Sequence, residues 1–504
     1  MSPKHSKVLE HWDTENPALW QQKERKIANR NFWISTICML LSFAIWQYWS
    51  IISVQMASAG YPFTTQQFFI LPAMAGLMGA TLRIPQAFVI ALAGGRNTTF
   101  VTMLLLLVPA FFTGLALQSL ATPFWVFVLL SALSGIGGGA FASIISNLGW
   151  FFPKKRKGIY LGLSAGIGNL GVSVMQFVLP LIVLWNVFGL WSGSPPYIAN
   201  SGYIWILPLL LLALASFWGL DNLRVASPHL CSTPIAIFKI LSLFLIGLAT
   251  GGVGIFLLLY WHITEWIVLP LVILLTVSAM KLLPGVIRKS VRQQFAIFRN
   301  KHTWILTYVY TMTLGSFIGF SAAFPLLIKS LFGGLGTASA ANAPNPFMYA
   351  WIGPFLASIV RPIGGMLADK WRGSRISFWV TICMIITTVA TGFVIHLANT
   401  APNSLSYFIP FLLLFLLLFV LTGLGNGSIY QMMAHAFTPH ESGPVMGWAS
   451  SVSAYGAYLI PSIFGAQIAL GRPSYALYGF AAYYLTCLFL LWYYYLRKHA
   501  EIEC

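Results

Sequence analysis

The 504-residue chain is poor in charged residues, and poorest in acidic ones. Charged residues make up 8% of it, and 10 Asp and Glu stand against 28 Lys and Arg, for a formal net charge of +18. A soluble domain carries about 25% charged residues, so this shortage excludes an ordinary soluble enzyme. The 58% of hydrophobic residues also excludes a disordered chain. The composition predicts a protein that crosses a membrane many times.

Cysteine, histidine and acidic residues are too sparse to build a catalytic or metal centre. The five cysteines are scattered and form no CxxC pair, so neither a disulfide framework nor a zinc site is predicted. The acidic residues all fall in tails, loops or the ends of apolar segments: Glu10, Asp13, Glu15, Glu24, Asp221, Glu265, Asp369, Glu441, Glu501 and Glu503. We therefore expect no enzyme, no metal and no cofactor.

Long apolar runs are abundant, and each is long enough for a helix of about 20 residues to cross a bilayer. The alternating pattern of barrel strands is absent, so we expect an all-α polytopic protein with about 14 spans. The predicted spans are 33–58, 66–92, 98–118, 124–147, 159–190 and 203–220; then 236–260 and 264–284; then 303–328, 348–368, 376–398, 407–434, 446–470 and 475–496.

These spans divide the chain into two six-helix bundles around an insertion. The predicted parts are an N-terminal segment (1–32), a first bundle (33–225), an inserted hairpin with a basic linker (226–300), a second bundle (301–497) and a tail (498–504). The function of the inserted hairpin cannot be inferred from its sequence. Its outer turn carries His262 and Glu265, which we interpret as a solvated hairpin tip.

Basic residues between the spans follow the positive-inside rule. The loops predicted outside contain only Lys329 and Arg472. The loops and tails predicted inside contain Arg96, Lys154, Lys155, Arg156, Lys157, Arg224, Lys239, the basic residues from Lys281 through Lys301, Lys370, Arg372, Arg375, Arg497 and Lys498. This asymmetry predicts a plasma (inner) membrane protein with both termini in the cytoplasm, and it explains the net charge without a nucleic-acid partner.

Two arginines, Arg83 and Arg361, fall inside predicted spans. An arginine at the centre of a membrane helix costs about 2.5–3.5 kcal/mol on insertion scales, and the sequence offers neither residue an acidic partner. Snorkelling to the interface is the alternative, more plausible for Arg361, which precedes Asp369 by two helical turns. We expect both guanidinium groups to face a central cavity and to have an anionic substrate as their counter-ion. The planar guanidinium group matches a planar oxyanion edge to edge, which lysine cannot do.

The two halves also echo each other. Each carries an arginine close to a proline in its second span, Arg83 before Pro85 and Arg361 before Pro362, and a glycine pair follows each of them. The fifth spans match more weakly, through the equal spacing of Gly162 from Gly171 and of Gly447 from Gly456. Repeats of this kind place a transporter's binding site near the bilayer midplane, between the halves.

The fifth span is rich in glycine, with Gly162, Gly166, Gly168 and Gly171 among its residues. Glycines at this spacing allow another helix to approach closely, so we expect them to serve packing or conformational change. Asn169 shares a helical face with Ser173 and Gln176, so it either donates to an anion or makes a hydrogen bond between helices.

Several longer stretches complete the pattern. They are Asn16–Gln22 (NPALWQQ), Leu82–Pro85 (LRIP), Phe151–Lys154 (FFPK), Gly166–Gln176 (GIGNLGVSVMQ), Gly315–Ala322 (GSFIGFSA), and Arg361 with its following glycines. With them the sequence resembles the nitrate/nitrite porter family (NarK/NasA type) of the major facilitator superfamily, across essentially all twelve core spans. The loop from Gly365 to Arg375, with Asp369 in it, resembles the cytoplasmic loop motif of that superfamily, although Arg372 adds one residue.

The resemblance implies a major facilitator fold of two pseudo-symmetric bundles, with nitrate held between Arg83 and Arg361 during alternating access. It further implies that Asn169 and Tyr310 contact the anion and that Phe43 and Phe141 sandwich it. Gly365 and Asp369 would serve the conformational change. Leu314 departs from the family, which usually has an aromatic residue there, and the region Gly447–Tyr458 has fewer glycines than the family's second signature.

The expected function is nitrate uptake in exchange for nitrite, because no acidic residue is predicted in the cavity to carry a proton. Nitrate/proton symport and a carrier for another small anion remain the alternatives, and an anion channel is a more distant one. The expected partners are nitrate, nitrite and the lipid bilayer, with no nucleic acid and no obligate protein partner.

Overall fold

The computed structural model describes residues 7–16, 20, 24–283, 288, 295–333 and 342–502. Parts of the Asn16–Gln22 stretch, most of the basic linker and the last two residues of the tail therefore lie outside the described residues, as do the side chains of Lys154 and Lys155. Within the described ranges, thirteen helical segments are long and apolar enough to cross a membrane.

The first half of the chain forms six spans, three of which are interrupted. They are α2 (Arg25–Gln47) with α3 (Trp49–Ser58), α4 (Thr65–Ala93), α5 (Gly95–Ala116), α6 (Phe124–Ser134) with α7 (Ile136–Leu148), α8 (Lys154–Ile182), and α9 (Asn200–Tyr203) with α10 (Ile206–Gly219). The first span begins well before residue 33, because a helix continues into the polar interface beyond its apolar run. The fifth ends at Ile182 instead of residue 190, just after Pro180.

The second half is built from the same number of spans. They are α14 (Lys301–Tyr310), a π-helical turn η4 (Thr311–Gly315), α15 (Ser316–Ile328) and a second π turn η5 (Lys329–Gly333); α16 (Pro346–Tyr349) with α17 (Ile352–Trp371); α18 (Gly373–Thr400); η6 (Ser404–Tyr407) with α19 (Phe408–Ala436); α20 (Pro439–Ser453) with α21 (Gly456–Ala469); and α22 (Ser474–Leu491) with the π turn η7 (Trp492–Leu496).

The span predicted at 446–470 is two helices, α20 and α21, which meet at Ala454 and Tyr455. A Cβ added at Gly456 would strike the main chain of Gly315, so the chain bends where two backbones touch. The thirteen candidates found among the described residues do not include this span.

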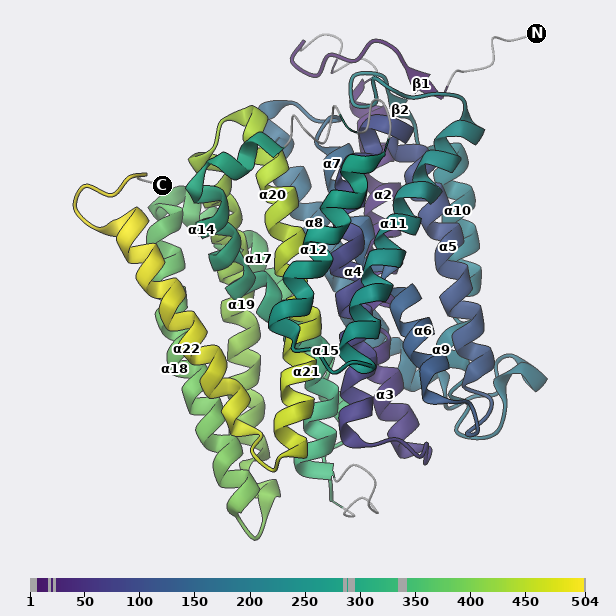
Figure 1. Cartoon of the computed structure of the whole chain (residues 1–504), viewed down its shortest axis with the longest axis vertical. Coiled ribbons are helices and arrows are strands. Elements are labelled where there is room, and N and C mark those ends of the chain that lie inside the picture. The colour runs from purple at the N-terminus through teal and green to yellow at the C-terminus, as the bar shows by residue number, and fades with distance from the viewer. Residues whose placement is uncertain are drawn as a thin grey trace.

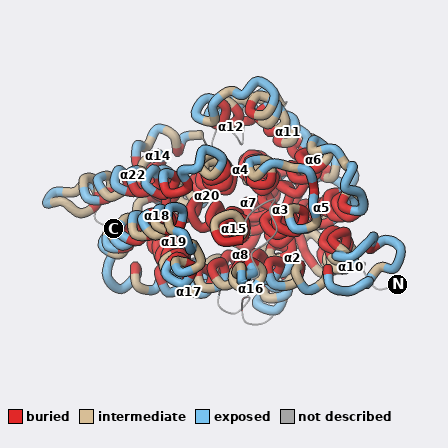
Figure 2. Tube along the Cα trace, turned by 90° about the horizontal axis from the view of Figure 1, so that it is seen from below, coloured by how far each residue is buried: buried red, intermediate tan, exposed pale blue. Residues whose placement is uncertain are grey.

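The two halves stand side by side, and both termini lie at the same end of the helices (Figure 1). The inserted helices, α11 (Thr233–Leu259) and α12 (Glu265–Leu282), lie along one edge of the molecule, outside the two bundles (Figure 2). The helix α11 packs on α4 through glycines: a Cβ at Gly247 would meet Leu82, and one at Gly251 would meet Met78. The hairpin is thereby attached to the first half, along the helix that carries Arg83.

A short parallel strand pair is the one element that the all-α expectation missed. Strand β1 (Val8–Leu9) pairs with β2 (Asn222–Leu223), and Glu10 forms an ion pair with Arg224 at 2.9 Å. Trp12 donates from its indole N–H to the Trp150 carbonyl oxygen at 3.0 Å. The N-terminal segment thus ties together the ends of two spans, as a clasp made of residues 7–12.

The Glu10–Arg224 pair makes this clasp pH-dependent. The hydrogen bond from Arg224 lowers the pKa of Glu10 below its ordinary value of 4.5. Because the folded-state pKa is depressed, the stabilisation is present above pH 4.5 and is lost as the pH falls through the folded-state value. At pH 7 we expect Glu10→Gln to speed amide hydrogen exchange in residues 7–12. Glu501→Gln, which breaks an ion pair with Lys301 near the other terminus, should leave that exchange unchanged.

Candidate functional site

Arg83 lies on α4 with 1% of its surface exposed. Its Nε donates to the Gly138 carbonyl oxygen at 2.9 Å, and its Nη1 donates to the Ser450 carbonyl oxygen at 3.0 Å. Its Nη2 is buried and has no hydrogen-bond partner, and no carboxylate among the described residues pairs with this side chain. Two backbone carbonyls therefore fix the guanidinium plane and leave one of its ends unsatisfied.

Three aromatic rings surround the Arg83 guanidinium group. Its Cζ lies 5.7 Å from the ring centroid of Phe43, 5.0 Å from that of Trp46 and 4.9 Å from that of Phe141. The rings of Phe43 and Phe141 are stacked, with centroids 6.0 Å apart and planes 23° from parallel. These ring faces offset part of the cost of burying the cation. Both predicted aromatics thus lie beside Arg83, and they lie against each other.

Trp46 is a neighbour of Arg83 that the sequence reasoning missed. Its indole N–H donates to the Ala75 carbonyl oxygen at 2.8 Å, which fixes the ring. Gly79 and Gly138 supply the space, since a Cβ at either position would overlap the indole. The sequence could have indicated Trp46 through its spacing of three residues from Phe43, because this spacing puts both rings on one helical face.

Arg361 lies on α17 and is 5% exposed. Its Nη2 donates to the Tyr310 hydroxyl at 3.4 Å, and its Cζ lies 5.7 Å from the ring centroid of Tyr430 on α19. Its Nη1 is buried without a hydrogen-bond partner, and in the described part of the chain no carboxylate reaches it. Arg361 therefore repeats the arrangement at Arg83: a buried cation beside an aromatic ring, with one free donor end. Tyr430 was not predicted.

The two arginines belong to one region between the halves. The charge of Arg361 acts on Arg83, and both charges act on the Tyr310 hydroxyl. The bond from Arg83 to Ser450 runs from α4 in the first half to α20 in the second. A second bond between the halves, at 2.9 Å, joins the hydroxyls of Thr81 and Tyr455. The site is thus a pair of like charges that no described side chain neutralises.

Asn169 lies on α8 and is 2% exposed. On the same helix, a Cβ at Gly166 would approach the Ser358 carbonyl oxygen to 3.6 Å and the Pro362 ring to 3.9 Å. The helix α8 therefore crosses α17 beside Arg361, and Asn169 lies one turn away from that crossing.

Gln176 shares the face of Asn169 but has a different role. Its Nε2 donates to the Ser321 carbonyl oxygen on α15 at 2.9 Å and to the Ser50 hydroxyl at 3.2 Å. It therefore links the two halves directly.

The predicted packing glycines fall into two groups. Gly168 lies against the side chain of Met39, and Gly171 lies against the backbone of Leu40, so a Cβ at either position would overlap α2. A Cβ at Gly162 would meet nothing within 4 Å, and one at Gly365 would only approach the Gly427 carbonyl oxygen at 3.8 Å. Asp369 is exposed near the end of α17 and forms no ion pair within the described ranges.

The contacts between the halves differ at the two ends of the helices. Away from the termini, a Cβ at Gly76 would overlap the main chain of Ala457, so α4 and α21 are in close contact there. At the end that holds the termini, a Cβ at each of four glycines of α8 and α20 would meet nothing within 4 Å: Gly158, Gly162, Gly443 and Gly447. The backbones of α4 and α21 therefore touch away from the termini, whereas these four glycines have open space beside them.

Two six-span halves with buried cations on facing helices define a membrane transporter of the major facilitator type, not an enzyme. Solved structures with this fold align over most of the chain. The xylose transporter XylE from E. coli, in a partially occluded inward-open conformation, aligns with a TM-score of 0.59 at 11% identity over 92% of this chain and 99% of that chain. A POT family transporter in complex with 5-aminolevulinic acid aligns with a TM-score of 0.62 at 12% identity, over 92% and 94%.

Sequence relatives identify the family, although no protein-family model matches the chain. The probable nitrate/nitrite antiporter NarK2 of Thermus thermophilus is 36% identical over 98% of this chain and 97% of its own length. The nitrate/nitrite transporter NarU of Salmonella typhimurium is 32% identical over 97% and 96%, and NarU of Escherichia coli matches to the same extent. The chain belongs to this family of nitrate/nitrite transporters.

Proposed function

We propose that the protein carries nitrate and nitrite across the plasma membrane by alternating access, with the anion held between Arg83 and Arg361. The observation that carries this proposal is the pair of buried, unsatisfied donors, Arg83 Nη2 and Arg361 Nη1. A buried donor without a partner costs about 1–3 kcal/mol, and more when it is charged, so the pair calls for a negative ligand. The relatives named as nitrate/nitrite transporters supply its identity.

The neighbouring groups suit a small planar anion. Arg83 has already used Nε and Nη1, and Arg361 has used Nη2, so each cation offers one edge to the ligand. Two like charges about 10 Å apart at an effective dielectric of about 20 repel by roughly 1.7 kcal/mol, and one anion between them relieves that repulsion. The amide of Asn169 adds a neutral donor, and Phe43 and Phe141 supply flat apolar walls.

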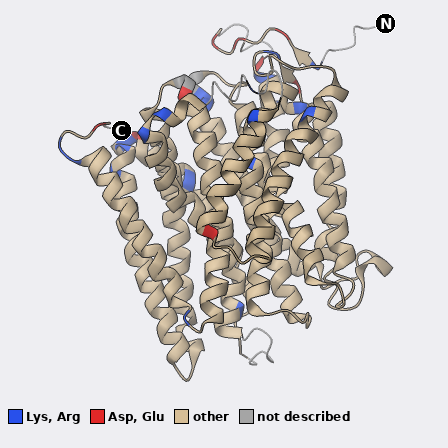
Figure 3. Ribbon diagram, viewed as in Figure 1, with Lys and Arg blue, Asp and Glu red and all other residues tan. Residues whose placement is uncertain are grey.

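The distribution of basic residues supports an orientation in the membrane. Lys and Arg gather at the end of the helices where both termini lie (Figure 3). By the positive-inside rule this end faces the cytoplasm. The four glycines of α8 and α20 that have open space beside them are at the same end.

The two arginine charges favour exchange of nitrate for nitrite over transport of one anion alone. An empty site must change conformation with two cations left unneutralised, whereas a loaded site has one of them balanced. The loaded carrier therefore switches faster, and exchange of two monovalent anions moves no net charge. Counterflow in proteoliposomes tests this: internal nitrite should accelerate nitrate entry without a pH gradient. Uptake that requires a pH gradient and ignores internal nitrite would instead support proton symport.

Tyr430 gives a matched test of the second cation. Tyr430→Leu removes the ring over Arg361, and since a cation–π contact contributes about 0.5–2 kcal/mol, nitrate affinity should fall by roughly 2- to 30-fold. Tyr430→Phe keeps the ring face and should bind nitrate like the wild type. Calorimetric titration of the purified variants measures both, and equal affinities for Leu and Phe would remove Tyr430 from the site.

A further inference from the structure

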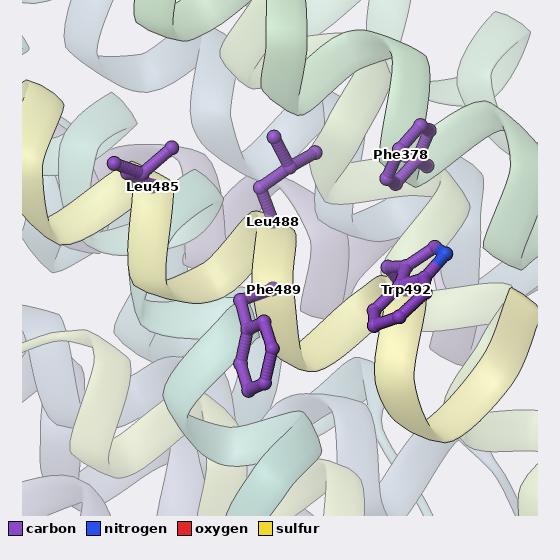
Figure 4. Close-up of a pocket in the computed structure, with 5 residues that line it drawn as sticks. All are labelled: Phe378, Leu485, Leu488, Phe489 and Trp492. Atoms are coloured by element: carbon purple, nitrogen blue, oxygen red, sulfur yellow. The ribbon is translucent and has the colours of Figure 1, made fainter. Parts of the chain in front are cut away.

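An apolar groove lies on the outer surface of the second half. Its volume is about 360 Å³, and it lies between α18 and α22 (Figure 4). The lining residues are Phe378, Leu485, Leu488, Phe489 and Trp492. Each of them is a hydrocarbon or aromatic side chain, so the groove suits an apolar guest.

The groove belongs to the membrane-embedded surface, near one end of it. Both flanking segments, Gly373–Thr400 and Ser474–Leu496, are candidate spans. They run antiparallel, since a Cβ at Gly392 would meet the ring of Tyr478, while Phe378 and Trp492 meet in the groove. The groove therefore opens to lipid close to the end of the spans that holds the termini.

Two stacked aromatic rings connect the groove to the guanidinium group of Arg497. Phe489, in the groove wall, stacks on Tyr493 with ring centroids 5.8 Å apart and planes 27° from parallel. The guanidinium Cζ of Arg497 lies 3.8 Å from the Tyr493 centroid. Its Nε is buried without a hydrogen-bond partner. The π turn η7 contains Tyr493 and ends next to Arg497.

A second cation flanks the same end. Arg375 is exposed, precedes Phe378 by three residues and therefore shares its helical face. No ion pair of Arg375 or Arg497 occurs in the described part of the chain, and the nearby Glu501 pairs with Lys301 and His302 instead. An apolar slot thus ends beside two cations that lack a counter-ion.

We propose that this groove binds an anionic phospholipid of the surrounding bilayer. One acyl chain lies along Leu485, Leu488 and Phe489, and the headgroup phosphate accepts hydrogen bonds from Arg497 and is attracted by Arg375. The occupant is a lipid because the groove opens to the hydrocarbon layer, and it is anionic because the charges at its end are positive. A basic pocket beside membrane helices is a recognised setting for such headgroups. The proposal is independent of the transported substrate.

Native mass spectrometry of the purified protein in detergent tests the proposal, with phosphatidylglycerol and phosphatidylcholine of the same chain length as probes. The wild type should bind phosphatidylglycerol roughly tenfold more tightly, because both lipids carry a phosphate but only phosphatidylcholine adds a cationic choline, which Arg375 and Arg497 repel. Arg497→Gln should reduce this preference to near unity. The matched control is Arg472→Gln, because Arg472 lies over Tyr475 at the other end of the same span, with its Cζ 6.0 Å from the ring centroid. It should keep the full preference.

Two more measurements make the test decisive. Leu488→Phe fills the groove and should lower the binding of phosphatidylglycerol while the melting temperature stays unchanged. Inorganic phosphate should not displace phosphatidylglycerol when it is added at the concentration at which the lipid saturates the groove, because phosphate lacks the acyl chain. An unchanged preference in a folded Arg497→Gln variant would overturn the proposal, as would full competition by free phosphate.

Discussion

Arg83→Lys is expected to lose nearly all nitrate transport while the protein folds and reaches the membrane normally. Lysine keeps the charge but cannot hold the Gly138 and Ser450 carbonyls and present a further N–H to the anion in one plane. Each charged hydrogen bond lost costs about 1.5–3 kcal/mol, or roughly 10- to 150-fold in affinity. Uptake of labelled nitrate into proteoliposomes, together with calorimetric titration, measures the loss.

A third buried arginine, Arg96, supplies the control for this experiment. Arg96 also lies over an aromatic ring, with its Cζ 4.3 Å from the Phe217 centroid, and its Nε donates to the Phe217 carbonyl oxygen at 2.7 Å. It is remote from the central site, so Arg96→Lys should leave nitrate affinity near the wild-type value. Arg83 has no role in substrate binding if both variants bind nitrate equally well.

Gly171→Ala is expected to destabilise the protein strongly. An added Cβ there would overlap the backbone of Leu40, and a backbone inside a packed helix pair cannot turn aside as a flexible side chain can. Overpacking of this kind costs about 1–3 kcal/mol or more. Thermal melting of the purified variant in detergent should therefore show a clear drop in Tm.

Gly162→Ala separates packing from transport. The same methyl group at Gly162 meets nothing within 4 Å, so the Tm of this variant should match that of the wild type. Under the proposed alternating access, transport should nevertheless slow, since Gly162 lies at the end that would close in an outward-facing state. A wild-type transport rate together with a wild-type Tm would show that this glycine takes no part in closure.

The sequence located the two arginines because a cation in an apolar span is a rare signal. It did not locate Trp46 or Tyr430, because 15% of this chain is aromatic and one ring looks like another until the helices are packed. The resemblance to relatives brought Phe43, Phe141 and Tyr310 forward, and those three lie beside the arginines in the structure. Their contacts with substrate stay a prediction.

The spans were predictable from hydropathy, but their interruptions were not. The break between α20 and α21 arises where Gly456 touches Gly315, a contact between residues far apart in the chain. The β1–β2 pair joins segments more than two hundred residues apart and involves two residues on each side, too few for any periodicity to register. Local patterns report which residues prefer lipid, whereas breaks and strand pairs depend on neighbours that only the folded chain supplies.

The acceptor that Arg83 uses in the second half is the main-chain oxygen of Ser450, not its hydroxyl. Every amino acid has a main-chain carbonyl oxygen, so the hydrogen bond from Arg83 tolerates substitution of the residue at position 450. If the hydrogen bond between the halves depended on two side chains, replacing it with another pair would need two compatible mutations. A substitution at position 450 can therefore change the side chain there without removing this hydrogen bond between α4 and α20.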